Sequence, residues 1–597
     1  MENLAEKMDD IWKKNKKQPK DIWFFYLFLL TFTLGVRKVI LYFLLKGAFN
    51  EYIGAYIYVS DIFLWLAILS WIIPILCNKI VNPSRISDGT FKFIHKIDHA
   101  EGVNNASIQN LSTGKIAYFK AFLTKLFHVE QSKRNVGEKC STWNIFCNFG
   151  VFLVPLLLVI WSFVSIFWSE NRAIGIYRSI GFLELYFLYS YIAIRFVPCY
   201  LLNCSTWNNF LYSSSNVSRG TILDEAMDSS TKLFHVEHFE YVLSKMTQYL
   251  RAILLGLIVV MLFDHYLWDI WQGQILFWLA CGLLAGISLR ERHNVSNCST
   301  WNNLRIENAS NVSRGTINNL GVFFGIIMLL GIMQSLAGIV QFIIQHSLGL
   351  FLLKESLIGQ SIPGVAKIVA NHHVFIRSYG LFPHPNILGG FLFFSIMATM
   401  LYSKLFHVEQ DAEKCSPWNN LSNNDLSVEN VPRGTIKSNF IKFVLAVQII
   451  GIILSFSKSA ILALLVALVY INVPRGTFRG ISLKKLFHVE HFRLLLGLGL
   501  ATLTGLFFFR VEFYVLLVKS LTERGLYLSI SERIIADNPM VGVGTGQFVI
   551  TAERLLPNLE IWQYQPVHNI FLLIWSEWGI VGLVLFVVFL WKLFHVE

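Results

Sequence analysis

The feature that most limits the fold of this sequence is a succession of apolar segments, each close to the ~20 residues that cross a bilayer as a helix. Of the 597 residues, 54% are hydrophobic and only 15% are charged, which excludes a soluble domain of this length. Backbone groups in lipid must be hydrogen-bonded within the chain, so these segments are expected to be helices. The sequence therefore predicts an all-α polytopic membrane protein with about twelve transmembrane helices. We place them at residues 22–36, 57–77, 146–168, 176–202, 249–263, 272–289, 320–345, 386–403, 440–455, 459–471, 493–509 and 569–591.

The distribution of basic residues predicts the orientation of the chain. The net charge is +12, and Lys and Arg gather in alternate loops. Because cytoplasmic loops carry the excess of Lys and Arg, both termini are expected inside, and the basicity needs no nucleic-acid partner. The polar N-terminus is too long for a cleaved signal peptide, so the first apolar segment is expected to be retained. Residues 440–471 form either one long span or two spans with a break at Ser455-Phe-Ser-Lys458-Ser. We prefer two spans, because this arrangement keeps the next basic loop on the cytoplasmic side.

Three short peptides recur in the predicted cytoplasmic loops: Lys-Leu-Phe-His-Val-Glu, Cys-Ser-Thr/Pro-Trp-Asn and Asn-Val-Pro/Ser-Arg-Gly-Thr. They are too short and too irregularly spaced to fold as repeat units. The palindromic DNA word TGTTCCACGTGGAACA encodes their shared parts in its three reading frames, so we interpret them as copies of one multiplied DNA element. Four of the eight Cys and seven of the sixteen His come from these copies, and no metal site is predicted from them.

These patterns divide the chain into segments. Insertions survive where they disturb no packed or catalytic surface, so the function is expected on the face opposite the repeats. The predicted segments are a cytoplasmic tail (1–21), a transmembrane bundle (22–345), an extracytoplasmic loop (346–385), further transmembrane helices (386–509), an extracytoplasmic catalytic loop (510–568) and a last transmembrane helix with its tail (569–597). The repeat-derived insertions are placed at about 103–145, 203–240, 294–317, 404–436 and 472–491.

Four motifs follow one another among the later apolar segments. Residues 377–386 read Arg-x-Tyr-Gly-x-Phe-x-His-Pro-Asn, and residues 455–460 read Ser-Phe-Ser-Lys-Ser-Ala. Residues 538–544 read Asn-Pro-x-x-Gly-x-Gly, and His568-Asn569 stands nine residues before Gly-x-x-Gly. In this order the chain resembles the O-antigen ligase and polymerase family of bacterial membrane glycosyltransferases.

The resemblance implies a GT-C-like fold and a reaction at the extracytoplasmic face of the inner membrane. A glycan would pass from an undecaprenyl-diphosphate carrier to a hydroxyl of an acceptor glycan, lipid or protein, with neither a cofactor nor a metal. It also implies the site residues. The catalytic ones would be His568 and Arg377, and the diphosphate- or substrate-binding ones would be Lys458, Arg524, Arg533, Tyr379, His384, Asn386 and Asn569.

The chemistry of these side chains fits the implied roles. A lipid diphosphate leaves with negative charge, so cations must hold it and a base must take the acceptor proton. The guanidinium of Arg377 suits phosphate oxygens, and the imidazole of His568 accepts a proton at neutral pH. Lys458 stands where the family more often has Arg, which keeps the charge and loses the planar geometry.

Structural roles compete with these assignments at several positions. His568 and His384 stand at helix starts, and Asn569 is better suited to capping a helix than to catalysis. Arg377 also suits an interfacial position with its charge in water, and Arg524 and Arg533 are equally explained as solvated loop charges.

One segment departs from the expected order. Residues 249–290, which include Asp264-His265-Tyr-Leu-Trp-Asp269, resemble a helix pair expected after the His-Asn motif, at the end of the chain. Copies of the repeat lie at 232–237 and 592–597, so recombination between them explains the displacement. If the pair no longer packs near His568, activity is not expected to survive.

Two other classes of function remain open. A transporter or flippase of lipid-linked sugars would also have many spans, but its charged site is expected near the midplane between internal repeats, which this sequence does not show. An inactive scaffold of the cell envelope is the other. The motifs leave open the choice between ligase, polymerase and protein glycosyltransferase.

Overall fold

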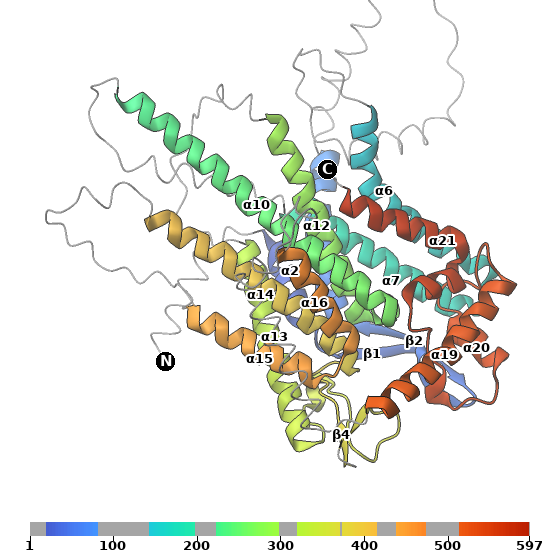
Figure 1. Ribbon diagram of the computed structural model, residues 1–597. Coiled ribbons are helices and arrows are strands. Elements are labelled where there is room, and N and C mark those ends of the chain that lie inside the picture. Colours follow the sequence, from blue (N-terminus) through green and yellow to red (C-terminus); the bar gives the residue numbers. More distant parts are fainter. Residues whose placement is uncertain are drawn as a thin grey trace, which may run out of the picture.

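A computed structural model describes residues 19–81, 142–197, 223–297, 319–370, 373–414, 438–472 and 513–595. In these ranges the chain is mostly helical, and long helices run side by side while short elements gather at one end of the bundle (Figure 1). The longer helices are α3 (Val59–Val81), α6 (Thr142–Val164), α7 (Arg172–Ser190), α10 (Leu223–Phe263), α12 (Trp271–Asn297), α13 (Asn319–Ile344), α14 (Pro385–Lys414), α15 (Ser438–Leu454), α16 (Lys458–Asn472), α19 (Phe513–Asp537) and α21 (Ile570–Phe594). The shorter ones are α2 (Lys20–Thr31), α11 (Tyr266–Asp269) and α20 (Phe548–Leu555).

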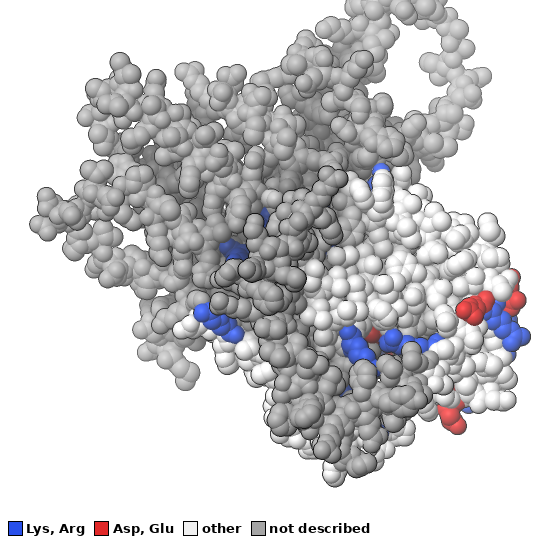
Figure 2. Space-filling view, in the orientation of Figure 1, with Lys and Arg blue, Asp and Glu red and all other residues white. Residues whose placement is uncertain are grey.

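Six of the described helices are long and apolar enough to cross a membrane. They coincide with predicted spans and comprise Gly150–Trp168, Leu243–Phe263, Trp271–Leu289, Leu320–Ile344, Pro385–Lys404 and Ile570–Phe594. Shorter apolar helices occupy Val59–Pro74, Asn439–Leu454 and Lys458–Asn472. The predicted span 493–509 lies outside the described residues, so the total of twelve and the orientation stay predictions. The described surface in Figure 2 is mostly uncharged, as expected of a multi-pass membrane protein.

The prediction of an all-α chain is wrong in two places, because the structure contains two two-stranded antiparallel sheets. The first joins β1 (Arg37–Leu45) to β2 (Ala48–Tyr58). Val, Ile, Tyr, Phe and Leu make up most of the two strands. The first four favour strands, and all five are also common in apolar membrane helices. The turn residues Lys46 and Gly47 both have positive φ, 49° and 80°, as a two-residue hairpin turn requires. The first predicted span therefore ends as a helix at Thr31.

The two predicted outer loops contain regular structure of their own. The first holds the second hairpin, β3 (Lys367–Ala370) and β4 (His373–Ile376). The second holds α19 and α20, so the segment that leads to His568 is largely helical. Figure 1 places both hairpins, α19 and α20 at the same end of the bundle.

The break predicted within residues 440–471 is present. α15 ends at Leu454 and α16 begins at Lys458, with Phe456 between them at φ 49°. A left-handed backbone is costly for a bulky residue and persists only where its surroundings enforce it. The Phe456 ring stacks on Phe342 of α13, with 6.2 Å between centroids. The Ser-Phe-Ser-Lys motif therefore forms a rigid turn between two helices.

The Asn-Pro-x-x-Gly-x-Gly motif packs into a kink of α21. The helix is interrupted at Gly579, whose φ is 66°, and the backbone N–H groups of Val543 and Gly544 donate to the freed carbonyls of Ser576 and Glu577 at 3.0 and 2.8 Å. The Glu577 carboxylate accepts in turn from Gly546 N at 3.0 Å. These glycines permit close backbone contact, which explains them without a phosphate-binding loop.

Replacing Gly542 by alanine is expected to destabilise the protein strongly. Gly542 has a φ of 68°, and an added Cβ would lie 2.4 Å from the Glu577 carbonyl carbon, so both strain and a backbone clash result. We expect the free energy of unfolding to fall by about 3 kcal/mol, which would be measured as a lower unfolding midpoint in detergent. Gly525→Ala is the matched control, because a Cβ there meets nothing within 4 Å and alanine favours helix. Equal midpoints for the two variants would contradict the packing described.

The displaced helix pair packs inside the bundle. α10 contacts α16, α12, α14 and α21, and α12 contacts α7. Nearly all residues of Trp271–Leu289 are buried, so α12 lies in the core of the bundle. The hypothesis of a moved hairpin is compatible with this, since a segment can pack in the same place from another position in the chain.

Candidate functional site

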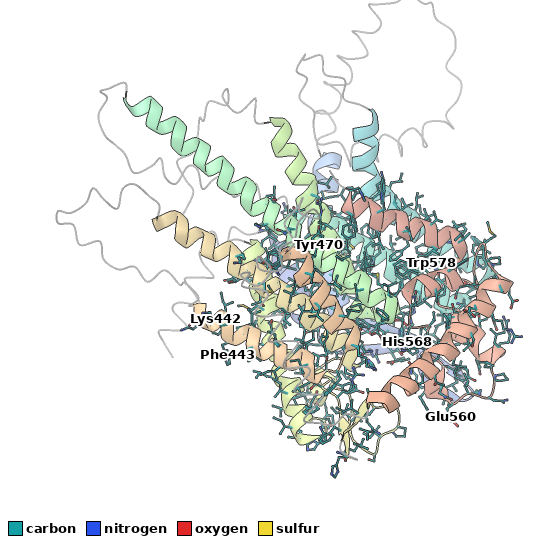
Figure 3. All side chains as sticks on the ribbon, viewed as in Figure 1. Lys442, Phe443, Tyr470, Glu560, His568 and Trp578 are labelled. Carbon is teal, nitrogen blue, oxygen red and sulfur yellow. The ribbon has the colours of Figure 1, made fainter. Side chains whose placement is uncertain are left out.

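His568 lies at the end of the bundle where the short elements gather, directly before α21 (Figure 3). The Tyr527 ring of α19 stacks on its imidazole, with 5.3 Å between centroids and 27° between planes. The His265 ring meets it edge-on at 4.8 Å and 89°. Nδ1 of His568 is buried and has no hydrogen-bond partner among the described residues. Burial, and after it the positive charges of His265 and Arg524, hold the pKa of His568 well below its usual value.

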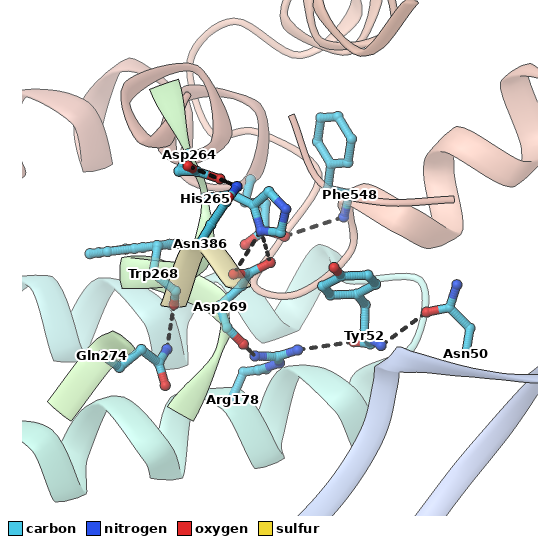
Figure 4. Close-up of polar contacts among 11 residues, drawn as sticks. Asn50, Tyr52, Arg178, Asp264, His265, Trp268, Asp269, Gln274, Asn386 and Phe548 are labelled. Carbon is cyan, nitrogen blue, oxygen red and sulfur yellow. Dashed lines mark hydrogen bonds and ion pairs between the residues drawn. The ribbon is translucent and has the colours of Figure 1, made fainter. Parts of the chain in front are cut away.

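The turn between α10 and α11 brings acidic and imidazole groups to this place. Nδ1 of His265 lies 2.9 and 3.0 Å from the two carboxylate oxygens of Asp269 (Figure 4). The side chain of Asn569 also donates to the Leu262 carbonyl at 3.3 Å. The displaced helix pair therefore contacts the His-Asn motif directly, which meets the structural condition set for preserved activity.

Arg377 and Asp264 are linked through Asn386. Nη2 of Arg377 donates to Asn386 Oδ1 at 2.6 Å, and Asn386 Nδ2 donates to both oxygens of Asp264 at 3.1 and 3.2 Å. Asp264 also accepts from the Ser459 hydroxyl at 2.8 Å. Nε of Arg377 donates to the Ser455 carbonyl at 2.8 Å, so the network returns to the turn before α16. Two motifs and the displaced pair thus meet in one hydrogen-bonded ring.

This ring fixes the orientation of the Arg377 guanidinium. Nη1 donates to no described residue, which leaves it available to an anion. Burial lowers the pKa of Arg377 to about 10, so the group is still charged at neutral pH. Burial also raises the pKa of Asp264. The nearby His265 and the hydrogen bonds that Asp264 accepts from Ser459 and Asn386 partly oppose this rise.

Two further predicted cations lie near Arg377. Lys458 is exposed at the first residue of α16 and interacts electrostatically with Arg524 and Arg377. The guanidinium carbon of Arg524 lies 6.0 Å from the centre of the Phe263 ring, at the end of α10. Arg524 therefore connects the cations to the imidazole, because it acts electrostatically on both Lys458 and His568.

Arg533 is not brought to this cluster. It is exposed on α19, nine positions after Arg524, and a helix turns by roughly 100° per residue, so the two point to opposite sides. Because Arg524 and Arg533 lie on opposite sides of α19, only Arg524 faces the site.

The other predicted residues have contacts within the protein. The Tyr379 hydroxyl accepts from Ala366 N at 2.7 Å, which fixes the loop before Arg377. His384 accepts from Asn386 N at 3.2 Å, and burial lowers its pKa to about 3, so it is neutral. Asn569 caps α21, because its side chain accepts from Leu572 N at 3.1 Å. The cap interpretation of Asn569 is confirmed.

The site contains three residues that the motifs did not supply: Asp264, His265 and Asp269. Their segment was recognised as a helix pair, but its position in the chain gave no reason to place these groups beside His568. The signal was present, because two Asp and a His between two apolar spans are costly unless paired.

The comparisons with known proteins cover part of this site. The sequence model described as O-antigen ligase matches residues 443–587, which include Lys458, Arg524 and His568. Comparisons with curated proteins and with solved structures gave no match. The resemblance drawn from the four motifs is thereby confirmed over residues 443–587, which match the O-antigen ligase family model.

Proposed function

We propose that this protein transfers a glycan from an undecaprenyl-diphosphate carrier to an acceptor hydroxyl at the extracytoplasmic membrane face. The observation that carries the proposal is the cluster of three cations, Arg377, Lys458 and Arg524, of which Arg524 acts electrostatically on the buried, neutral imidazole of His568. The membership of residues 443–587 in the O-antigen ligase family supports glycan transfer as the reaction class. Ligase and polymerase activity differ only in the acceptor, and both are compatible with this arrangement.

The proposed reaction is a displacement at the anomeric carbon. The acceptor oxygen forms a bond to that carbon while the bond from the carbon to the diphosphate oxygen breaks. The acceptor proton passes to His568, and undecaprenyl diphosphate leaves with its electron pair. Arg377, with Lys458 and Arg524, would stabilise the charge that develops on the leaving diphosphate.

The depressed pKa of His568 fits a base that is completed by its substrate. In the free protein, burial and nearby positive charge keep the imidazole neutral and weakly basic. A bound diphosphate would neutralise part of the surrounding positive charge, and a neighbouring anion raises the pKa of an imidazole. His568 would then become a stronger base only when the donor is in place.

Purified protein in lipid vesicles provides the test. The donor is an undecaprenyl-diphosphate-linked oligosaccharide extracted from the membranes of the source bacterium, and the acceptor fraction comes from the same membranes. We expect undecaprenyl diphosphate to be released only when the acceptor fraction is present. Movement of the donor between leaflets without its cleavage would instead support the flippase alternative, and neither activity would support the scaffold.

A further inference from the structure

The His265 and Asp269 side chains form a buried pair beside the proposed base. They are four positions apart, so one helical turn brings them together, and His265 is 5% exposed. Arg178 of α7 donates to the Asp269 carbonyl, and it also donates to the Tyr52 carbonyl at 3.0 Å. The Tyr52 ring packs edge-on against His265, with 5.7 Å between centroids (Figure 4). The pair is therefore held from two other elements.

We propose that the His265–Asp269 pair positions His568 electrostatically and sets the pH range in which His568 acts as a base. This inference rests on the proposed role of His568 in glycan transfer. It assigns His265 and Asp269 as positioning residues, since neither needs to touch the substrate.

The geometry favours an effect through space. Catalytic imidazoles are commonly oriented by a hydrogen bond from Nδ1 to a carboxylate or carbonyl, which also raises their basicity. Nδ1 of His568 has no such partner among the described residues, whereas Nδ1 of His265 has both oxygens of Asp269. The carboxylate partner thus belongs to the neighbouring ring, whose edge meets His568.

The groups that face the two imidazoles define the sign of the effect. Those acting on His568 are His265, Arg524 and His384, with the Tyr527 ring stacked on it. Those acting on His265 are Asp269, Asp264 and Glu51, which together raise the pKa of His265 against the opposing effect of burial. His265 is thereby stabilised as an imidazolium, and its positive charge disfavours protonation of His568.

His265→Gln removes this positive charge and leaves the Asp269 carboxylate. The pKa of His568 should then rise, so the variant should lose activity at a higher pH as the solution is acidified. Charges about 5 Å apart interact by the equivalent of about one pK unit or more near a protein surface. We expect the acid limb of kcat/KM to move up by about one pH unit or more, toward the range of an ordinary histidine. Asp269→Asn should move the acid limb in the same direction but by less. Without the carboxylate, His265 is no longer held as an imidazolium, so the positive charge of His265 and the negative charge of Asp269 are lost together.

The experiment measures release of undecaprenyl diphosphate in vesicles between pH 5 and 8 for wild type, His265→Gln, Asp269→Asn and Asp269→Glu. Asp269→Glu keeps the carboxylate and should restore the wild-type limb, which a loss of packing alone would not do. If His265→Gln does not fold, Asp269→Asn with its Glu counterpart provides the same comparison.

The outcomes separate this inference from the proposed function. An upward shift in His265→Gln supports the inference, and so does an upward shift in Asp269→Asn that is absent in Asp269→Glu. An acid limb that stays at the wild-type pH in the folded variants overturns it, while an inactive His568→Gln would still support the proposed function. Full activity of His568→Gln would overturn the proposed function itself.

Discussion

Replacing His568 by glutamine is expected to lower glycan transfer by about 10²–10⁴-fold, the usual contribution of a positioned general base. Glutamine keeps most of the volume and the contact with Tyr527 but takes up no proton at neutral pH. The acceptor hydroxyl would then attack without a base, so kcat should fall more than the affinity for the donor. The measurement is the rate of undecaprenyl diphosphate release at saturating donor.

His373→Gln is the matched control for this substitution. His373 is an exposed residue of β4 that pairs with Ala370 of β3, and none of the groups that act on His568 among the described residues is His373. The control should retain the wild-type rate and unfolding midpoint. A His568→Gln variant with a rate within about twofold of this control would mean that the acceptor proton leaves by another route.

Replacing Arg377 by alanine is expected to lower transfer by about 10²–10³-fold. Nε and Nη2 donate to Ser455 and Asn386, which fixes the guanidinium and leaves Nη1 without a partner among the described residues. Arg377→Lys keeps the charge but cannot serve both partners and a phosphate oxygen with one ammonium group. We therefore expect the lysine variant to lose most of the activity as well.

The matched control for Arg377 is Arg554→Ala. Arg554 is an exposed arginine whose ion pair with Glu170, at 3.2 Å, is also exposed, and such pairs contribute little. It should behave as wild type in rate and stability. Full activity of Arg377→Lys would show that the site needs only a positive charge, and full activity of Arg377→Ala would remove Arg377 from the reaction.

The sequence predicted the long helices well because their apolar length alone decides them. α13 and α21 correspond to the predicted spans 320–345 and 569–591 within a few residues. The hairpin at residues 37–58 was missed because its apolar strand residues resemble a membrane helix in composition. Its turn at Lys46-Gly47 was the only local sign, and a Lys-Gly pair is a weak one.

The site was predicted in part. The motifs supplied Arg377, Asn386, Lys458 and His568, and Arg524 was added for its charge; hydrogen bonds and electrostatic interactions link these five residues in the structure. Arg533 was added from its charge alone, and its position on the far side of α19 separates it from them. Asp264, His265 and Asp269 were missed because the order of segments along the chain does not determine which helices pack together.

By itself, the sequence determined that this protein lies in a membrane and indicated the family that it resembles. Apolar segments of bilayer length require helices in lipid, and the four motifs indicated the family and the type of reaction. Only the tertiary structure decided how the base is surrounded. The turn between α10 and α11 lies some 300 residues before His568 in the chain, yet its imidazole packs 4.8 Å from that of His568. Electrostatic effects depend on distance in space and on burial, so neither the identity of these partners nor the protonation of His568 could be read from the order of residues.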